Sequence, residues 1–114
     1  MVDDELSILR FVKTSLSLAG YDALTASSGE EALRLARTEN PDIVILDIFM
    51  PSMSGYEVLR KMRKFTDVPV IIFSANRSAY EKAMEYSADG FINKPFKPGD
   101  LVRKIEGILD GRRQ

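Results

Sequence analysis

The sequence has 114 residues, a length typical of one domain. Its 16 basic and 17 acidic residues give a formal net charge of −1, so we do not expect this chain to bind nucleic acid directly. It contains neither cysteine nor histidine, which excludes disulfides, cysteine nucleophiles and histidine-based catalysis or metal binding. Any bound metal would therefore be a hard cation held by oxygen atoms.

The beginning of the chain and its apolar runs argue against export and membrane insertion. Residues 1–5 are acidic overall and cannot open a secretory signal peptide. No apolar run approaches the roughly 20 residues that are needed to cross a bilayer. We expect a cytoplasmic protein with one domain over residues 1–114 and no membrane partner.

Short apolar segments predict β-strands. In chain order they are a stub at Met1 and Val2, a weaker segment at 21–26, two unbroken runs at 43–46 and 70–73, and a weaker segment at 90–92. The two unbroken runs are rich in β-branched residues and do not alternate with polar ones. This pattern is typical of strands that are covered on both faces of a parallel sheet.

Apolar residues at helical spacing follow each predicted strand. The first helix is expected to end at Gly20, and Ser28 and Ser54 are expected to cap the second and third. The second must end before Pro41, and the fifth is expected to end before Gly111, with a frayed tail. Alternating strands and helices predict an α/β fold, a doubly wound parallel sheet with helices on both faces.

Reactive side chains follow the predicted strands, where such folds bind their ligands. Asp3 and Asp4 follow the first strand, Asp47 the third, Ser74 the fourth and Lys94 the fifth. Three carboxylates at close range repel one another, and Mg²⁺ resolves that repulsion with an oxygen shell. A lysine and a hydroxyl suit a phosphate group, and a carboxylate can accept a phosphoryl group. The pattern predicts a Mg²⁺-dependent phosphoryl acceptor.

Each of these residues also has an ordinary explanation when it is taken alone. Asp3 and Asp4 could begin a helix, and Asp47 could open a turn before a proline. Ser74 could bond to the backbone, and Lys94 could be a solvated surface residue. Only their shared position at the strand ends favours the functional interpretation.

The chain resembles the receiver domains of two-component response regulators. The likeness covers essentially the whole sequence, and its motifs occur in the family's order. They are residues 2–5 (VDDE), 43–51 (IVILDIFMP), 53–55 (MSG), 69–75 (PVIIFSA) and 88–96 (ADGFINKPF).

The resemblance implies a phosphorylation site with a bound metal ion. Asp47 matches the phosphorylated aspartate of the family. Asp4 matches a direct Mg²⁺ ligand, Asp3 acts mostly through water, and the backbone carbonyl of Phe49 matches a further ligand. The phosphoryl group would come from a sensor histidine kinase or a phosphotransfer protein.

The resemblance also implies how the phosphorylated state is sensed. Lys94 matches the lysine that contacts the acyl phosphate, and the Lys94–Pro95 peptide bond matches one that is usually cis. Ser74 matches the hydroxyl that turns toward the phosphoryl group, and Phe91 matches the switch aromatic. Because phenylalanine has no hydroxyl to solvate, we expect the Phe91 ring to be at least partly inward.

The implied fold is a flavodoxin-like (βα)5 domain with strand order 2-1-3-4-5. Phosphorylation would alter the surface made by the fourth helix, the fifth strand and the fifth helix, which could meet an effector domain or a partner protein. A phosphorylation-dependent dimer is left open. The expected helices span residues 5–20, 28–39, 54–64, 77–87 and 98–110.

The sequence departs from the family at a few positions. Only Met1 and Val2 precede the acidic pair, where a full strand is usual, so we expect that residues before Met1 are missing here. Glu106 and Asp110 stand where winged-helix transcription regulators often carry basic residues, which weakens assignment to that subclass.

Other functions remain open at this point. A Mg²⁺-dependent phosphatase with an aspartyl-phosphate intermediate would carry a second aspartate two residues after Asp47, where Phe49 stands. A nucleotide- or flavin-binding domain would need glycine motifs that the sequence lacks. A receiver-like binding module without phosphorylation is the remaining alternative. We expect that the chain is not an enzyme beyond its own phosphorylation and dephosphorylation.

Overall fold

A computed structural model describes residues 1–2, 6–48, 53–74, 84–85, 88–93 and 97–113. In chain order the elements are α1 (Leu6–Leu18), α2 (Gly29–Thr38), β1 (Val44–Asp47), α3 (Gly55–Met62), β2 (Val70–Ser74), β3 (Gly90–Asn93) and α5 (Pro98–Arg113). The predicted helix 77–87 lies outside the described residues except for 84–85, which are helical.

The strands form a parallel sheet in the predicted order. β1, β2 and β3 are neighbours in that sequence, with Val44 opposite Val70 and Ile71 opposite Gly90. Val2 pairs with Leu46 of β1 on one side and with Ala26 on the other. Across the sheet the chain segments therefore follow the order 2-1-3-4-5, which confirms the flavodoxin-like prediction.

The predicted segment 21–26 contributes less to the sheet than expected. Only Ala26 pairs with Val2, and residues 21–25 have no regular structure. The Met1 amino group donates a hydrogen bond to the Leu24 carbonyl at 2.7 Å, and burial lowers the pKa of that amino group to about 6. A partner segment as short as Met1 and Val2 leaves little backbone for residues 21–25 to pair with.

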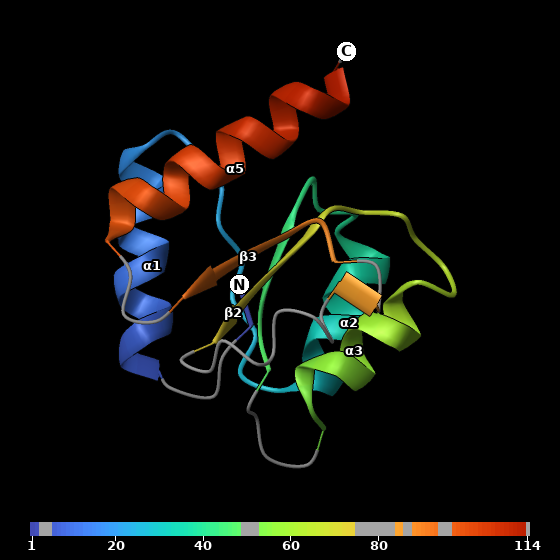
Figure 1. Ribbon diagram of the computed structural model, residues 1–114. Helices are drawn as coiled ribbons and strands as arrows, with labels where there is room; N and C mark the ends of the chain where they lie inside the picture. Colours follow the sequence, from blue (N-terminus) through green and yellow to red (C-terminus); the bar gives the residue numbers. More distant parts are fainter. Residues whose placement is uncertain (3–5, 49–52, 75–83, 86–87, 94–96, 114) are drawn as a thin grey trace.

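Helices cover both faces of the sheet, as the unbroken apolar strands predicted (Figure 1). On one face α2 and α3 pack over Val44, Leu46 and Ile72. On the other face α1 and α5 pack over Ile45, Ile71 and Phe73. Alternate strand residues thus enter opposite cores, which explains why neither β1 nor β2 carries an exposed side chain.

The helix ends follow the sequence signals with one exception. Ser28 and Ser54 accept hydrogen bonds from the backbone amides of Glu31 and Glu57, so both predicted caps are confirmed. Gly20 lies beyond α1 with a φ of +92°, a conformation that ends a helix. By contrast, α5 continues through Gly111 to Arg113, so the expected end at residue 110 is wrong. Gly111 is not in the left-handed conformation, and a glycine that stays right-handed weakens a helix without ending it.

Candidate functional site

The site begins at the carboxyl end of β1, where Asp47 is the last residue of the strand. Asp47 is buried with 3% of its surface exposed, between Leu46 and Ile48, which are also buried. Its backbone amide donates to the Val2 carbonyl at 3.0 Å. The strand core thus fixes the backbone of a carboxylate at the edge of the sheet where parallel α/β folds carry their chemistry.

Gly55 holds the chain that follows Asp47. The Gly55 amide donates to the Ile48 carbonyl at 2.8 Å, and a Cβ at Gly55 would lie 2.3 Å from the Asp47 carbonyl oxygen. No side chain fits there, because the atom in the way belongs to the backbone. The sequence analysis placed Gly55 only on a helix face. Its signal was a glycine at the start of a helix that Ser54 already caps, where glycine is otherwise unfavourable.

Ser74 lies beside this end of β1. It is the last residue of β2 and is fully buried. Asp47 is opposite Phe73, so Ser74 is one residue beyond the partner of Asp47, at the same edge. In the other direction Ser74 is opposite Asn93 of β3. The structure therefore brings Asp47 and Ser74 to neighbouring strand ends, as the sequence predicted.

Phe91 lies in β3, opposite Ile72. Its side chain is half-buried and packs against the core under α2 and α3. This agrees with the expected inward bias of the ring. Movement of the ring on phosphorylation stays a prediction.

The remaining predicted site residues lie outside the described part of the chain: Asp3, Asp4, Phe49, Lys94 and Pro95. Among the described residues, no three acidic, histidine or cysteine side chains gather into a metal-binding group, since only Asp47 of the predicted carboxylates is described. The metal ligands, the lysine contact and the cis peptide bond therefore stay predictions.

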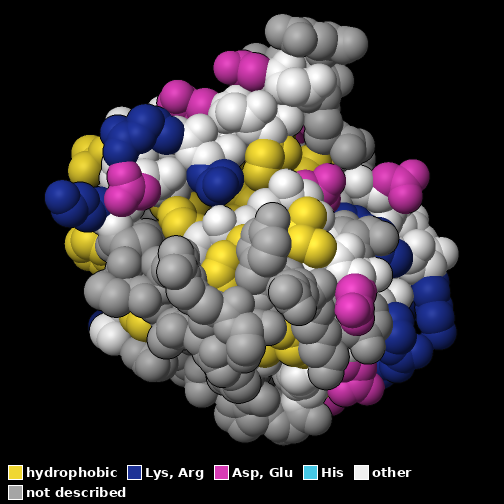
Figure 2. Space-filling model, viewed as in Figure 1, with side chains coloured by type: hydrophobic (Ala, Val, Ile, Leu, Met, Phe, Trp, Pro, Cys, Tyr) yellow, Lys and Arg dark blue, Asp and Glu magenta, His cyan; other side chains and the backbone are white. Residues whose placement is uncertain are grey.

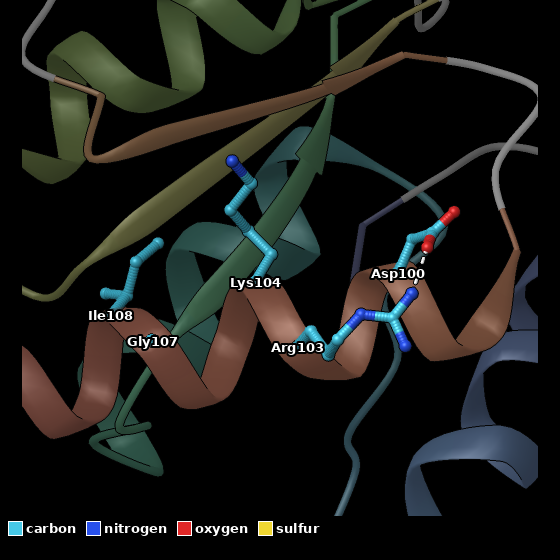
Figure 3. Close-up of a pocket in the computed structure, with 5 residues that line it drawn as sticks. All are labelled: Asp100, Arg103, Lys104, Gly107 and Ile108. Carbon is cyan, nitrogen blue, oxygen red and sulfur yellow. Dashed lines mark hydrogen bonds and ion pairs between the residues drawn. The ribbon is translucent and has the colours of Figure 1, made fainter.

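A hollow of about 380 Å³ lies on α5, away from Asp47 and Ser74 (Figure 3). The residues that line it are Asp100, Arg103, Lys104, Gly107 and Ile108. Arg103 turns along the helix and forms an ion pair with Asp100, whereas Lys104 and Ile108 lie against Gly90 of β3. The hollow belongs to the surface that the predicted switch would alter.

The described surface mixes positive and negative side chains. On the face shown in Figure 2, Lys and Arg side chains lie interspersed with Asp and Glu side chains around the described residues. No helix among those described has the length and apolar character of a membrane-spanning segment.

Comparison with known proteins identifies the family. The profile of the response regulator receiver domain matches residues 1–106, almost the whole chain. A response regulator receiver domain protein (CheY-like) from Methanospirillum hungatei has a similar structure, with a TM-score of 0.93 and 30% identity over 98% of this chain and 92% of that one. The chain belongs to the response regulator receiver domains.

Curated relatives are longer than this chain. A probable transcriptional regulator ycf27 from Guillardia theta is 45% identical over 111 residues, which are 96% of this chain and 44% of the relative. The alkaline phosphatase synthesis transcriptional regulatory protein PhoP from Bacillus subtilis is 38% identical over 112 residues, 96% of this chain and 47% of PhoP. The chain spans about half the length of these relatives.

Proposed function

We propose that the chain receives a phosphoryl group on Asp47 from a histidine kinase or a phosphotransfer protein. The observation that carries this proposal is the position of Asp47. It is a buried carboxylate at the carboxyl end of a central strand, with the hydroxyl residue Ser74 at the end of the next strand. The family membership supports the same role.

In the proposed reaction a carboxylate oxygen of Asp47 attacks phosphorus. The new P–O bond forms as the bond between phosphorus and the donor imidazole nitrogen breaks, and the donor keeps that electron pair. Asp47 needs no proton acceptor, because an ionised carboxylate is already the nucleophile. The held backbone around Asp47 would supply the alignment on which in-line transfer depends.

The donor set fits Mg²⁺ as far as the structure describes it. Asp47 places an oxygen ligand of the type that Mg²⁺ prefers at this edge of the sheet, and the sequence supplies Asp3, Asp4 and the Phe49 carbonyl for the rest. Bound Mg²⁺ would neutralise charge on the carboxylates and on the incoming phosphoryl oxygens. We propose it as the cofactor.

We further propose that the chain turns over no small substrate and acts as a switch for a larger regulator. The relatives named above are transcriptional regulators about twice as long as this chain, so an effector outside it would read the surface around β3 and α5. Ser74 and Phe91 would connect Asp47 to that surface, because their strands are neighbours.

The test is phosphorylation by acetyl phosphate, followed by intact mass. We expect one phosphoryl group on the wild type when Mg²⁺ is present and none with EDTA. Asp4→Ala should lose both Mg²⁺ binding and labelling while it stays folded. Labelling that is independent of Mg²⁺, or steady release of nitrophenol from p-nitrophenyl phosphate, would contradict the proposal.

A further inference from the structure

A group of hydrogen bonds joins α3 to the start of β3, at the amino end of the sheet. We call it the Arg63–Asp89 clasp. Nη2 of Arg63 donates to Oδ2 of Asp89 at 3.0 Å, and the same oxygen accepts the Val70 amide at 2.8 Å. Nη1 of Arg63 donates to the Val68 carbonyl at 2.7 Å. The Asp89 amide in turn donates to the Val70 carbonyl at 2.8 Å, so both strand starts are tied together.

β3 depends on such an anchor more than the other strands do. Among the described strands it lies at the edge of the sheet and pairs only with β2. It is four residues long and begins with Gly90, which has no side chain to pack and is flexible in the unfolded chain. A slip of one residue would turn every side chain of the strand to the opposite face.

The register of β3 decides which residues lie beside the functional site. Asp89 immediately precedes β3, and the register that begins there places Phe91 opposite Ile72 and Asn93 opposite Ser74. A loss of register would remove Phe91 from the core under α2 and α3, against which it now packs. The anchor at the amino end therefore sets the geometry at the carboxyl end.

The clasp also reaches the chain around Asp47 through α3. Arg63 is the residue at which α3 ends, and its side chain forms the clasp. Gly55, at the beginning of α3, contacts the backbone of Asp47 and Ile48. One helix of two turns thus touches the Asp47 backbone at one end and the anchor of β3 at the other.

We propose that Arg63 and Asp89 are positioning residues, which hold Phe91 in register with Ser74 so that phosphorylation of Asp47 reaches β3. This inference rests on the proposed function. It assigns a role in the switch to two residues at the end of the sheet opposite Asp47. Neither residue touches the phosphoryl group.

The test measures the response to beryllofluoride, a phosphoryl mimic, by amide and side-chain NMR shifts. In the wild type with Mg²⁺, signals of Leu46 and Ile48 should shift together with those of Phe91. In Asp89→Ala the shifts near Asp47 should remain, and the Phe91 response should fall by about tenfold, the factor expected when a buried amide loses its partner.

Graded variants and a control separate positioning from stability. Asp89→Asn can still accept the Val70 amide, so it should keep a larger Phe91 response than Asp89→Ala, and it provides the test if the alanine variant does not fold. Arg63→Lys keeps the charge and should respond more strongly than Arg63→Met. Ala36→Gly weakens α2 without touching the clasp and should keep the full Phe91 response.

Hydrogen exchange gives a second measurement. Amide protection in β3 should fall by about tenfold in Asp89→Ala relative to β1, which the clasp does not touch. A full Phe91 response in both Asp89 variants would overturn this inference and leave the proposed function standing. A wild type without any shift near Asp47 would overturn the proposed function itself, and this inference with it.

Discussion

The two ends of the sheet both carry an acidic side chain but use it differently. At the amino end, Asp89 is partly exposed, pairs with Arg63 and accepts a backbone amide of β2. At the carboxyl end, Asp47 is almost completely buried beside the buried Ser74. A buried carboxylate is costly to the fold unless other groups compensate its charge. The comparison indicates that the amino end is built for stability and the carboxyl end for chemistry.

Replacement of Asp47 should break this comparison most strongly. We expect Asp47→Asn to lower the rate of labelling by acetyl phosphate at least about a thousandfold, since the amide is no longer an anionic nucleophile. Its free energy of unfolding should stay equal to that of the wild type or rise, because a buried charge is removed. Labelling and urea denaturation measure the two effects. Undiminished labelling would show that another residue is the acceptor.

A methyl group at Gly55 should disturb the carboxyl end through the backbone. The added Cβ would lie 2.3 Å from the Asp47 carbonyl oxygen, so the chain must shift. We expect Gly55→Ala to lower the free energy of unfolding by about 3 kcal/mol and to slow phosphorylation. Denaturant unfolding and labelling rates on the same samples would test this. A variant as stable and as reactive as the wild type would contradict the close contact.

Gly107 provides the matched control for that substitution. A Cβ at Gly107 meets nothing within 4 Å, and the residue lies inside α5. Gly107→Ala should therefore raise the free energy of unfolding by about 1 kcal/mol through helix propensity. Phosphorylation should be unchanged. A loss of stability here would mean that the contrast with Gly55 does not depend on space.

The smallest expected effect concerns the amino end again. The guanidinium of Arg37, in the last turn of α2, lies 4.6 Å from the ring centre of Phe65, which follows α3. Arg37→Ala should cost about 0.5 to 1 kcal/mol of stability and leave phosphorylation unchanged. Arg37→Lys should recover part of that loss. A change in phosphorylation would mean that the two ends of the sheet are not separable in this way.

The sequence predicted the features that depend on local patterns. The unbroken apolar runs identified β1 and β2, because strands buried on both faces have no polar face to show. Ser28 and Ser54 identified two helix starts, because capping acts within three residues. Asp47 and Ser74 were found at one edge, because strand direction alone brings parallel strand ends together.

The features that the sequence missed depend on tertiary contacts. Arg63 and Asp89 are 26 residues apart, and neither residue carries a signal that it would pair with the other. The contact between Gly55 and the Asp47 carbonyl depends on how α3 meets the sheet. Gly111 was misinterpreted because a glycine ends a helix only when its backbone adopts the left-handed conformation, which the residue type alone does not fix.

The central segment of the sheet has a mechanical consequence. Val2 donates to the Ile45 carbonyl and accepts the Asp47 amide, while the Met1 carbonyl accepts the Ala26 amide. A pull on Met1 and Val2 along the strand direction would load these bonds together in shear rather than one after another. The load would arrive at the backbone amide of Asp47 without passing through any side chain. Tension on this segment would therefore be felt first at the phosphoacceptor.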